Sequence, residues 1–506
     1  MRESALAALG ADSFDIFIIG GGATGAGIAL DAAARGLKVG LAERADFSEG
    51  TSSRSTKLIH GGVRYLELAV KKLDRSQLNL VRSALHERYT LLRIAPHLSR
   101  AFPLLTPLYR YWELPYYYTG LKMYDLIAGR HRIGASRLLG RRATMTELPG
   151  LSGDGLKGAV EYFDGQFDDS RMVISLLRSA RQRGATVLNH ASVTALDVTA
   201  GEVTVQDGPT GSVVQVQAKV IINATGPFAD AVRRMDEPDA PDLLTASSGS
   251  HIVLEGGIVP SRSGMLIPRT DDGRVLFLLP WQGHTLVGTT DDPAVAEAAP
   301  DAPERDVDYL LDYVNRYMDR AFTRADVLSA WTGFRPLLKP SRDASTASIT
   351  RDHYIGTSPS GLITVTGGKW TTYRLMAEDA VDLAIRQGAL SPPRPCTTGD
   401  LLLTGAEGFD PGSGGALAAE FGLDADIASH LLHAYGSEAA AVIGSKGGHT
   451  RLHPDHPYLE EEVRHARDLE FALSAEDVLD RRLRLGFLDS AARNAVLDRT
   501  RELLAA

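Results

Sequence analysis

The sequence predicts an α/β fold, α+β overall, with three parts: a Rossmann-like dinucleotide-binding domain, an antiparallel-sheet cap and a C-terminal helical domain. Near the N-terminus a glycine-rich turn joins an apolar strand to an alanine-rich helix, as in nucleotide-binding βαβ units. Two later apolar strands, 219–224 and 362–365, also end at glycine turns. Beyond a proline-rich linker at 392–395 the chain has the periodicity of amphipathic helices. Its 506 residues are enough for about three domains.

The first βαβ unit is predicted from the N-terminal residues. Residues 14–19 form a run rich in Ile and Phe, which is typical of a buried parallel strand. Residues 23–35 are rich in alanine and predict a helix that Gly36 closes. Residues 37–41 predict the next strand, which ends at Glu43.

The later elements follow a less regular order. Residues 50–64 are polar and glycine-rich, and residues 102–124 are crowded with aromatic residues and prolines. Helices are expected at 73–95, 169–183 and 373–386, and a strand at 185–193. Buried strands are expected at 219–224 and 362–365, and antiparallel strands at 274–279 and 285–289 around Gly283.

The pattern Gly20-x-Gly22-x-x-Gly25 lies directly between the first strand and the first helix. These glycines allow a tight turn, a close approach of the backbone to a pyrophosphate, and close packing of helix on strand. A phosphate placed there faces the positive end of the helix. The Glu43 carboxylate, about twenty residues on, suits ribose hydroxyls. The sequence therefore predicts a dinucleotide site.

The glycine pattern alone does not separate NAD from FAD. A nicotinamide domain would finish its sheet within the next hundred or so residues, whereas here the segments Asn223-Ala224-Thr225-Gly226 and Gly367-Gly368-Lys369 follow strands far along the chain. A sheet assembled from distant segments around one long ligand fits FAD. That these are ordinary strand-end turns stays an open alternative on pattern alone.

Composition restricts the partners and the compartment. The net charge of -9 gives no general basic field, so no nucleic acid is expected. A single cysteine, Cys396, leaves no disulfide framework and no cysteine-ligated metal cluster, so no metal is predicted. Residues 1–13 are short and charged, unlike a signal peptide, and no apolar run is long enough to span a bilayer. We expect a cytoplasmic chain, with peripheral membrane contact left open.

Seven motifs give the chain a family resemblance. They are residues 20–27 (GGGATGAG), 50–66 (GTSSRSTKLIHGGVRYL), 223–228 (NATGPF), 249–253 (GSHIV), 288–291 (GTTD), 333–337 (GFRPL) and 367–374 (GGKWTTYR). In these motifs the chain resembles the FAD-dependent glycerol-3-phosphate dehydrogenases. The likeness is dense over about residues 14–390 and looser beyond them.

The resemblance implies a domain layout. An FAD-binding Rossmann-like domain of the glutathione-reductase type would comprise 12–90, 155–245 and 345–390. A substrate-binding cap would comprise 91–154 and 246–344, and the C-terminal helical domain 396–506.

The resemblance also implies an activity and its partners. Members oxidise glycerol 3-phosphate to dihydroxyacetone phosphate and pass electrons to a membrane quinone, so the chain is expected at the inner face of the cell membrane. A homodimer is a further expectation. Some relatives are oxidases that use oxygen.

Site residues are carried over by motif. The cofactor would be bordered by Gly20, Gly22, Gly25, Glu43, Arg44, Thr51, Ser52, Lys57, Gly61, Gly62, Val193, Gly226, Gly368 and Thr371. The substrate phosphate needs cations, and the resemblance implies Arg64, Arg335 and Lys369 for this purpose, with Tyr65 as a neutral donor and Arg335 also counted among the catalytic residues.

The candidates for the catalytic base are His60 and His251, because histidine can take a proton near neutral pH. His60 is slightly favoured, since the two glycines that follow it allow close approach to a flat ring. A structural role for either histidine is about as probable on the residues alone.

The aromatic segment 102–124 is a candidate for membrane contact. It holds six tyrosines and Trp112, with Arg100, Arg110, Lys122 and Arg130 around them, and aromatics with cations suit a headgroup interface. A cap-domain core with a few exposed tyrosines is an equal alternative.

Three other functions remain open on the sequence alone. The first is an oxygen-using glycerol-3-phosphate oxidase, the second a flavin oxidoreductase for another substrate, and the third a non-enzymatic flavoprotein. The three cations favour a phosphorylated substrate over the second, and the histidines argue against the third.

Overall fold

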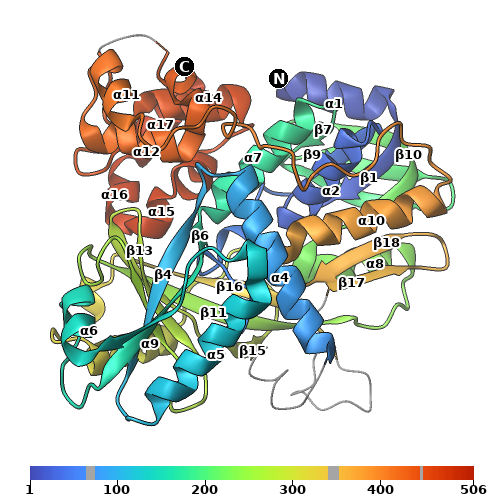
Figure 1. The fold of residues 1–506 in the computed structure, drawn as a ribbon. Helices are drawn as coiled ribbons and strands as arrows, with labels where there is room; N and C mark the ends of the chain where they lie inside the picture. Colours follow the sequence, from blue (N-terminus) through green and yellow to red (C-terminus); the bar gives the residue numbers. More distant parts are fainter. Residues whose placement is uncertain (64–74, 340–352, 445–447) are drawn as a thin grey trace.

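The computed structural model describes residues 1–63, 75–339, 353–444 and 448–506. Two sheets and a group of C-terminal helices make up the molecule (Figure 1). The predicted α/β (α+β) class is confirmed, because one sheet is mainly parallel, the other mainly antiparallel, and the last hundred residues are helical.

The first sheet has the strand order β17-β18-β10-β1-β2-β7, and β8 and β9 extend it beside β10. Its strands are β1 (Ser13–Ile19), β2 (Val39–Ala42), β7 (Thr186–Leu188), β8 (Ala191–Asp197), β9 (Glu202–Asp207), β10 (Val213–Asn223), β17 (His353–Thr357) and β18 (Ile363–Gly367). Strands β18, β10, β1, β2 and β7 are parallel. The carboxyl ends of β1, β2, β10 and β18 therefore meet at one edge, where α/β proteins bind dinucleotides.

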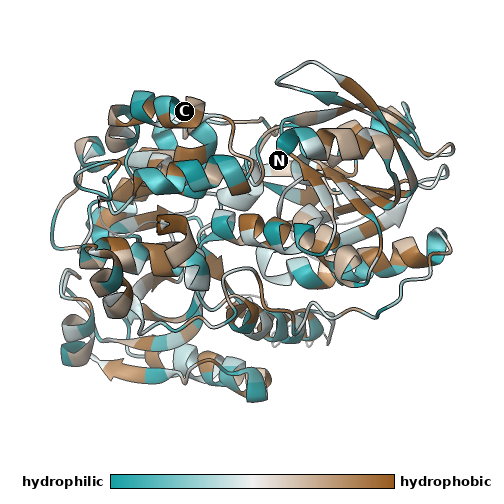
Figure 2. Ribbon diagram, turned by 90° about the horizontal axis from the view of Figure 1, so that it is seen from above, coloured by the Kyte–Doolittle hydropathy of each residue, from teal (hydrophilic) through white to brown (hydrophobic). Residues whose placement is uncertain are grey.

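Helices cover this parallel sheet. Most residues of β1 and of α2 (Ala23–Ala34) are buried, and α2 contacts both α7 (Asp169–Arg181) and α10 (Tyr373–Gln387). Helix α1 (Arg2–Ala11) packs on β10 and β7, and α8 (Ala229–Asp236) follows β10. Figure 2 shows the hydrophobic strands enclosed by these helices. Burial on both faces explains why the strands are continuous apolar runs.

The second sheet forms the cap and has the order β15-β11-β14-β13-β12-β4-β6-β3, with β16 beside β11 and β5 beside β6. Its strands are β3 (Leu58–Ile59), β4 (Ser99–Leu108), β5 (Arg137–Gly140), β6 (Gly158–Phe167), β11 (Leu244–Leu254), β12 (Gly264–Ile267), β13 (Leu276–Trp281), β14 (His284–Gly288), β15 (Asp292–Ala294) and β16 (Ser329–Leu338). The predicted antiparallel pair around Gly283 is confirmed as β13 and β14.

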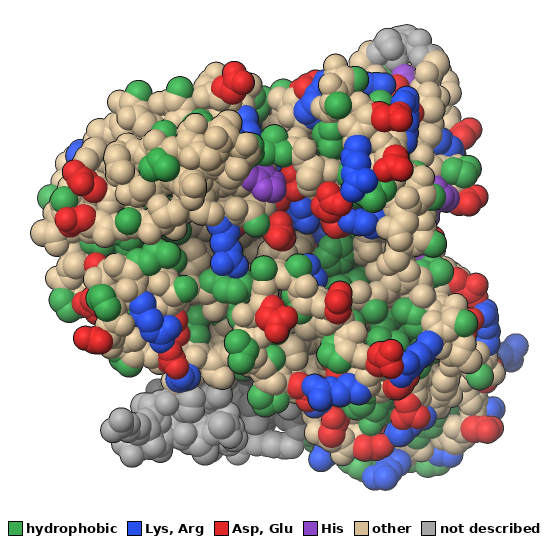
Figure 3. All heavy atoms as spheres, turned by 180° about the vertical axis from the view of Figure 1, so that it is seen from behind, with side chains coloured by type: hydrophobic (Ala, Val, Ile, Leu, Met, Phe, Trp, Pro, Cys, Tyr) green, Lys and Arg blue, Asp and Glu red, His purple; other side chains and the backbone are tan. Residues whose placement is uncertain are grey.

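Helices also surround the cap. They are α4 (Arg75–Ile94), α5 (Glu113–Ala128), α6 (Arg141–Glu147) and α9 (Glu304–Tyr317). Seen from behind, much of the surface around the cap carries positive and negative side chains intermixed (Figure 3), as in the ion pairs of Arg324 with Asp308 and Arg316 with Asp312.

The C-terminal helices lie above the cap sheet and beside the parallel sheet (Figure 1). They are α11 (Gly414–Phe421), α12 (Ala425–Tyr435), α13 (Ala439–Ile443), α14 (Glu460–Leu469), α15 (Leu485–Leu488), α16 (Ser490–Ala495) and α17 (Leu497–Ala505), with a π-helical turn, η8 (Asp477–Arg482), before α15. Residues of these helices share one hydrophobic cluster with β4, β6 and β13 of the cap.

One strand prediction is wrong. Residues 185–193 form two short strands, β7 and β8, and not one. His190 has a positive φ of 48°. Its ring contacts Asp477 at 2.9 Å, and the neighbouring Asn189 donates to Asp46 and to the Phe471 carbonyl. The chain therefore turns here to meet the C-terminal helices.

Candidate functional site

The turn from β1 to α2 has the backbone that the three glycines predict. Gly20 has φ of +110°, and a Cβ on it would lie 2.7 Å from the Ala224 carbonyl oxygen at the end of β10. A Cβ on Gly25 would lie 1.9 Å from the Gly20 carbonyl oxygen. Gly22 is the N-cap residue of α2. The helix N-terminus therefore comes close to the sheet edge, as a pyrophosphate site requires.

Glu43 stands directly after β2, at the same edge. Its carboxylate accepts hydrogen bonds from the backbone amides of Gly21 at 2.6 Å and Ala45 at 3.0 Å. Burial raises the pKa of this carboxyl, although both amides oppose the rise. The carboxylate is thus held rigidly beside the glycine turn, in the position expected for a ribose contact.

Other predicted cofactor residues lie around the same edge. The guanidinium of Arg44 lies 4.0 Å from the ring centroid of Phe228. Phe228 ends the short helix η3 (Gly226–Phe228), whose first residue, Gly226, has φ of +57°. The Gly226 carbonyl accepts from Thr366 in β18. Val193 is half-buried in β8, at a β-bulge. Gly368 has φ of +70°.

The segment 51–62 joins these separate parts. Ser52, in the short helix η1 (Thr51–Ser53), accepts at its hydroxyl from the Ala23 amide of α2 at 2.9 Å. Its carbonyl accepts from Trp370 Nε1 at 2.9 Å, and Thr51 donates to the Phe334 carbonyl at 2.6 Å. Thr371 donates to the His60 carbonyl at 3.2 Å. We call residues 51–57 the FAD loop, because the family resemblance predicts that this segment borders the cofactor and Ser52 bonds to the start of α2.

Two glycines follow His60 in this segment. Gly61 is buried, and its amide donates to the Tyr124 hydroxyl at 2.8 Å. Gly62 has φ of +84°. His60 itself is half-buried at the end of β3.

Lys57 is the last residue of the FAD loop, and its side chain is fully buried. Its ammonium donates to the Ser53 carbonyl and to Asp169 Oδ2, both at 2.7 Å. Burial lowers the pKa of Lys57 to about 7 against the opposing effect of Asp169. The ammonium is therefore committed to the loop backbone and Asp169, and contributes to the cofactor site through the shape of the loop.

Arg335 and His251 lie on one face of the cap sheet. Strands β11 and β16 pair with Ser247 opposite Arg335 and His251 opposite Trp331. The Arg335 guanidinium lies over Gly249, where a Cβ would be 2.5 Å from Nη2. Residues 249 and 251 point to the same face of β11, because side chains alternate along a strand. The predicted cation and the predicted base are therefore neighbours.

Hydrogen bonds fix both side chains. Arg335 donates to the carbonyls of Ser248 and Thr290 and pairs with Asp291 at 3.2 Å. His251 Nε2 contacts the Thr56 hydroxyl at 3.0 Å, and its ring stacks on Trp331 with centroids 5.4 Å apart.

Burial holds the pKa of His251 well below its ordinary value, and the positive charges of Lys57 and Arg335 lower it further. The imidazole is thus neutral at physiological pH, the form that can accept a proton, and its lowered pKa makes it a weaker base than an ordinary histidine.

Lys369 is half-buried just after β18 and caps the short helix η6 (Trp370–Thr372). The residues that follow it, Trp370 and Thr371, are the ones bonded to Ser52 and His60. Arg64 and Tyr65 lie outside the described residues.

Several residues were missed as site residues from the sequence. Thr56 and Gly249 lie inside the motifs of the family resemblance, so the motifs themselves could have pointed to them. Trp331 lies two residues before one of these motifs. Asp169 had no local signal, because it is an ordinary first-turn residue of α7 that the fold brings to Lys57.

Two family models together match most of the chain. The sequence model of the FAD dependent oxidoreductase family matches residues 15–382, and that of the C-terminal domain of alpha-glycerophosphate oxidase matches residues 396–506. A mitochondrial glycerol-3-phosphate dehydrogenase of Arabidopsis thaliana is 45% identical over 100% of this chain and 84% of its own length. The human mitochondrial enzyme of that name is 45% identical over 99% of this chain and 72% of its own length.

The chain belongs to the FAD-dependent oxidoreductases, among the glycerol-3-phosphate dehydrogenases. A solved member of this family, the glycerol-3-phosphate dehydrogenase of Bacillus halodurans complexed with FAD, superposes with a TM-score of 0.79 and 29% identity, covering 100% of this chain and 93% of that one. The L-alpha-glycerophosphate oxidase of Mycoplasma pneumoniae shares the fold, with a TM-score of 0.58 and 18% identity over 77% of this chain and 98% of that one.

As in its family, the cofactor of this chain is FAD. The residues fit it: a glycine cradle that any Cβ at 20 or 25 would fill, a helix N-terminus for the pyrophosphate, and a fixed carboxylate for the ribose.

Proposed function

We propose that this chain oxidises sn-glycerol 3-phosphate to dihydroxyacetone phosphate. The observation that carries the proposal is the shared face of β11, where the Arg335 guanidinium and the neutral His251 are neighbours. The FAD loop is hydrogen-bonded to both strands of this pair, through Thr56 to His251 and through Thr51 to Phe334. A phosphate clamp and a base thus lie against the loop that borders the cofactor.

Each group has a defined chemical task. The flavin ring, when bound, supplies the hydride-accepting chemistry. Arg335 offers a planar fork to phosphate oxygens, which would replace its present bonds to the Ser248 and Thr290 carbonyls and to Asp291, and Lys369 adds a compact charge. His251 takes the hydroxyl proton of the substrate in its neutral form, held in place by Thr56 and Trp331. His60, beside Gly61 and Gly62, positions the segment near the ring.

The test of this function is a comparison of substrates with an artificial electron-accepting dye. Purified protein should oxidise sn-glycerol 3-phosphate, and should be far slower with glycerol, because the phosphate clamp is then unused. Equal rates with glycerol would overturn the phosphate-clamp assignment. Oxygen consumption without dye would instead favour the oxidase alternative, which the matching C-terminal family model keeps open.

We also propose that the chain contacts an anionic membrane surface, at the inner face of the cell membrane, and passes its electrons to a quinone there. Within the described residues, none of the helices is both long and apolar enough to traverse a bilayer. A quinone is apolar, so an enzyme that reduces it has to reach the bilayer.

The structure limits which part of the aromatic segment can serve this contact. Phe102 in β4 and Tyr124 in α5 are buried in the cap, so those ends of segment 102–124 belong to the core. Three aromatic side chains before and in the first turn of α5 are exposed, namely Tyr111 at 74%, Trp112 at 59% and Tyr116 at 44%. Helix α5 lies along the lower edge of the cap in Figure 1.

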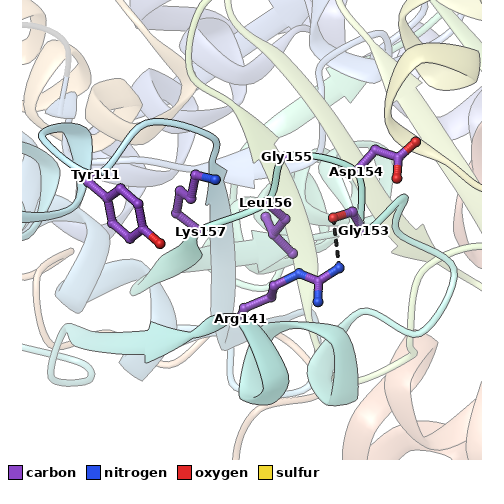
Figure 4. A pocket seen from close by; sticks show the side chains of 7 residues that line it. All are labelled: Tyr111, Arg141, Gly153, Asp154, Gly155, Leu156 and Lys157. Carbon is purple, nitrogen blue, oxygen red and sulfur yellow. Dashed lines mark hydrogen bonds between the residues drawn. The ribbon is translucent and has the colours of Figure 1, made fainter.

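Cations surround these aromatic residues. Residues 110–142 contain seven Lys and Arg against two Asp and Glu, in a chain of net charge -9. Beside Tyr111 an open pocket of about 330 Å³ is lined by Arg141 and Lys157, with Asp154 at its other end (Figure 4). The Lys157 ammonium lies 5.1 Å from the Tyr111 ring centroid. This combination suits anionic headgroups.

Vesicle sedimentation tests the contact. We expect wild-type protein to bind phosphatidylglycerol vesicles more than phosphatidylcholine vesicles, and the double variant Tyr111→Ser, Trp112→Ser to lose most of this binding. Leu402→Ser with Leu473→Ser is the control, since these leucines are also exposed, at 43% and 40%, but lie elsewhere in the chain. Unchanged binding of the aromatic variant would contradict this surface. The proposed homodimer is tested separately by light scattering.

A further inference from the structure

A buried charged cluster lies under the FAD loop and includes a residue of the C-terminal domain. Arg484 Nη2 donates to the Ser53 carbonyl at 2.6 Å and approaches Asp169 Oδ1 at 3.3 Å. Lys57 binds the same Ser53 carbonyl and the other oxygen of Asp169. Both cations and Asp169 have fully buried side chains. One backbone carbonyl of the FAD loop thus accepts from two cations, one of which comes from the far end of the chain.

Arg484 is held for this contact in an unusual backbone conformation. It has φ of +70°, the left-handed region, which is costly for a residue with a side chain. Its other terminal nitrogen donates to the Asp480 carbonyl at 2.8 Å. One terminal nitrogen of the guanidinium therefore binds η8 and the other binds the FAD loop. These simultaneous contacts require the two terminal nitrogens of an arginine.

Phe487 of α15 reaches the same region. Its ring lies 4.9 Å from that of Trp331, which in turn stacks on His251. The Arg484 guanidinium lies 4.4 Å from the Phe487 ring centroid, and the Lys57 ammonium 5.8 Å from it. The C-terminal domain therefore supports both the FAD loop and the wall behind His251.

We propose that Arg484 is a positioning residue for FAD: it fixes the Ser53 carbonyl, and through it the turn that holds Ser52 against the N-terminus of α2. Charge-assisted hydrogen bonds in a buried site are strong and orienting. Without this contact, Lys57 alone holds the Ser53 carbonyl, and the loop loses this hydrogen bond to the C-terminal domain. This inference rests on the FAD loop bordering the cofactor, as the proposed function requires.

The test compares Arg484→Lys with Arg171→Lys in full-length protein. Arg171 is also a buried arginine that bridges to the C-terminal domain through a two-pronged pair with Glu470, but its side chain donates to Glu470 and to the Ala434 carbonyl, and not to the FAD loop. FAD is removed, and its dissociation constant is measured by fluorescence titration, alongside the melting temperature of each apoprotein.

We expect the dissociation constant for FAD to rise at least tenfold in Arg484→Lys and less than twofold in Arg171→Lys, even where both variants lose similar melting temperature. Equal effects in the two variants, or none in Arg484→Lys, would overturn the proposal. Asp169→Asn removes the carboxylate charge that Lys57 and Arg484 share, and it should also weaken FAD binding.

If neither cluster variant folds while Arg171→Lys does, the cluster serves folding and the proposal is likewise overturned. Failure of the proposed function gives a different result, namely wild-type protein that binds FAD normally but is not reduced by glycerol 3-phosphate.

Discussion

At the scale of single residues, the site depends on side chains that share one face of β11. Gly249 has no side chain where the Arg335 guanidinium lies, and Gly288 has none where the His251 ring lies, since a Cβ there would be 2.1 Å from the ring. These two glycines let a cation and an imidazole pack closely against the backbone. The arrangement makes the phosphate clamp and the base separately testable.

Replacing Arg335 by lysine keeps the charge and removes the fork. We expect kcat/KM for glycerol 3-phosphate to fall about 10- to 100-fold, because a hydrogen bond to a charged group contributes about 1.5–3 kcal/mol. Steady-state kinetics measure this. Arg324→Lys, an exposed arginine of the cap that pairs with Glu304 and Asp308, is the control and should change little.

The pH dependence of flavin reduction should distinguish the histidines. Because the pKa of His251 lies well below 6.5, its imidazole stays neutral as the pH falls from 7.5 to 6. If His251 is the base, stopped-flow reduction rates should therefore hold over this range. A fall in rate centred near pH 6.5 would assign the proton to a group with an ordinary histidine pKa and would remove His251 from that role.

At the scale of elements, the strands and the helix of the nucleotide site could be predicted from the sequence, but the point where the predicted strand 185–193 is interrupted could not. The unit β1–α2–β2 followed from an apolar run, three glycines and an alanine-rich helix, all local signals. The break between β7 and β8 has its cause in Asp46, Asp477 and the Phe471 carbonyl, which are distant in sequence. The burial of Phe102 could not be predicted from local sequence either, because it depends on the pairing of β4 with the distant strand β6.

The glycine turn gives a matched pair of variants. Gly20→Ala adds a Cβ in a left-handed conformation and against the Ala224 carbonyl, whereas Gly184→Ala at φ of +94° adds one in open space. The backbone strain of about 1–2 kcal/mol is common to both. We expect a larger loss of melting temperature and weaker FAD binding only in Gly20→Ala. Equal losses would show that close packing at Ala224 contributes nothing.

At the scale of the whole molecule, ion pairs attach the C-terminal domain to the FAD domain. Arg481 and Arg482 both bind Asp46, three residues after Glu43, and Arg171 binds Glu470 through both carboxylate oxygens. These pairs join residues more than 290 positions apart, so no local pattern could reveal them. The sequence analysis predicted helices here but not their role.

Acid should weaken this attachment. Burial alone would raise the pKa of Glu470, but Arg171 and His465 hold it well below the usual 4.5. Its contribution to stability is therefore present above about pH 4.5 and is lost as the pH falls further. Glu470→Gln should cost about 3–5 kcal/mol at pH 7, because it leaves Arg171 buried without its partner charge.

Differential scanning calorimetry at pH 7, 5 and 4 measures both effects. The variant should lose less melting temperature than wild type between pH 5 and 4. Parallel curves for the two proteins would contradict the assignment of that acid sensitivity to Glu470.

The central claim is that a phosphate-binding cation and a neutral histidine lie beside the flavin-binding loop of this chain. Anaerobic titration of the FAD-loaded protein with sn-glycerol 3-phosphate tests it most directly. We predict that the flavin absorbance near 450 nm bleaches with glycerol 3-phosphate and not with glycerol, and that Arg335→Ala needs far more substrate to bleach. A flavin that stays oxidised with glycerol 3-phosphate, or that bleaches equally with glycerol, would contradict the account.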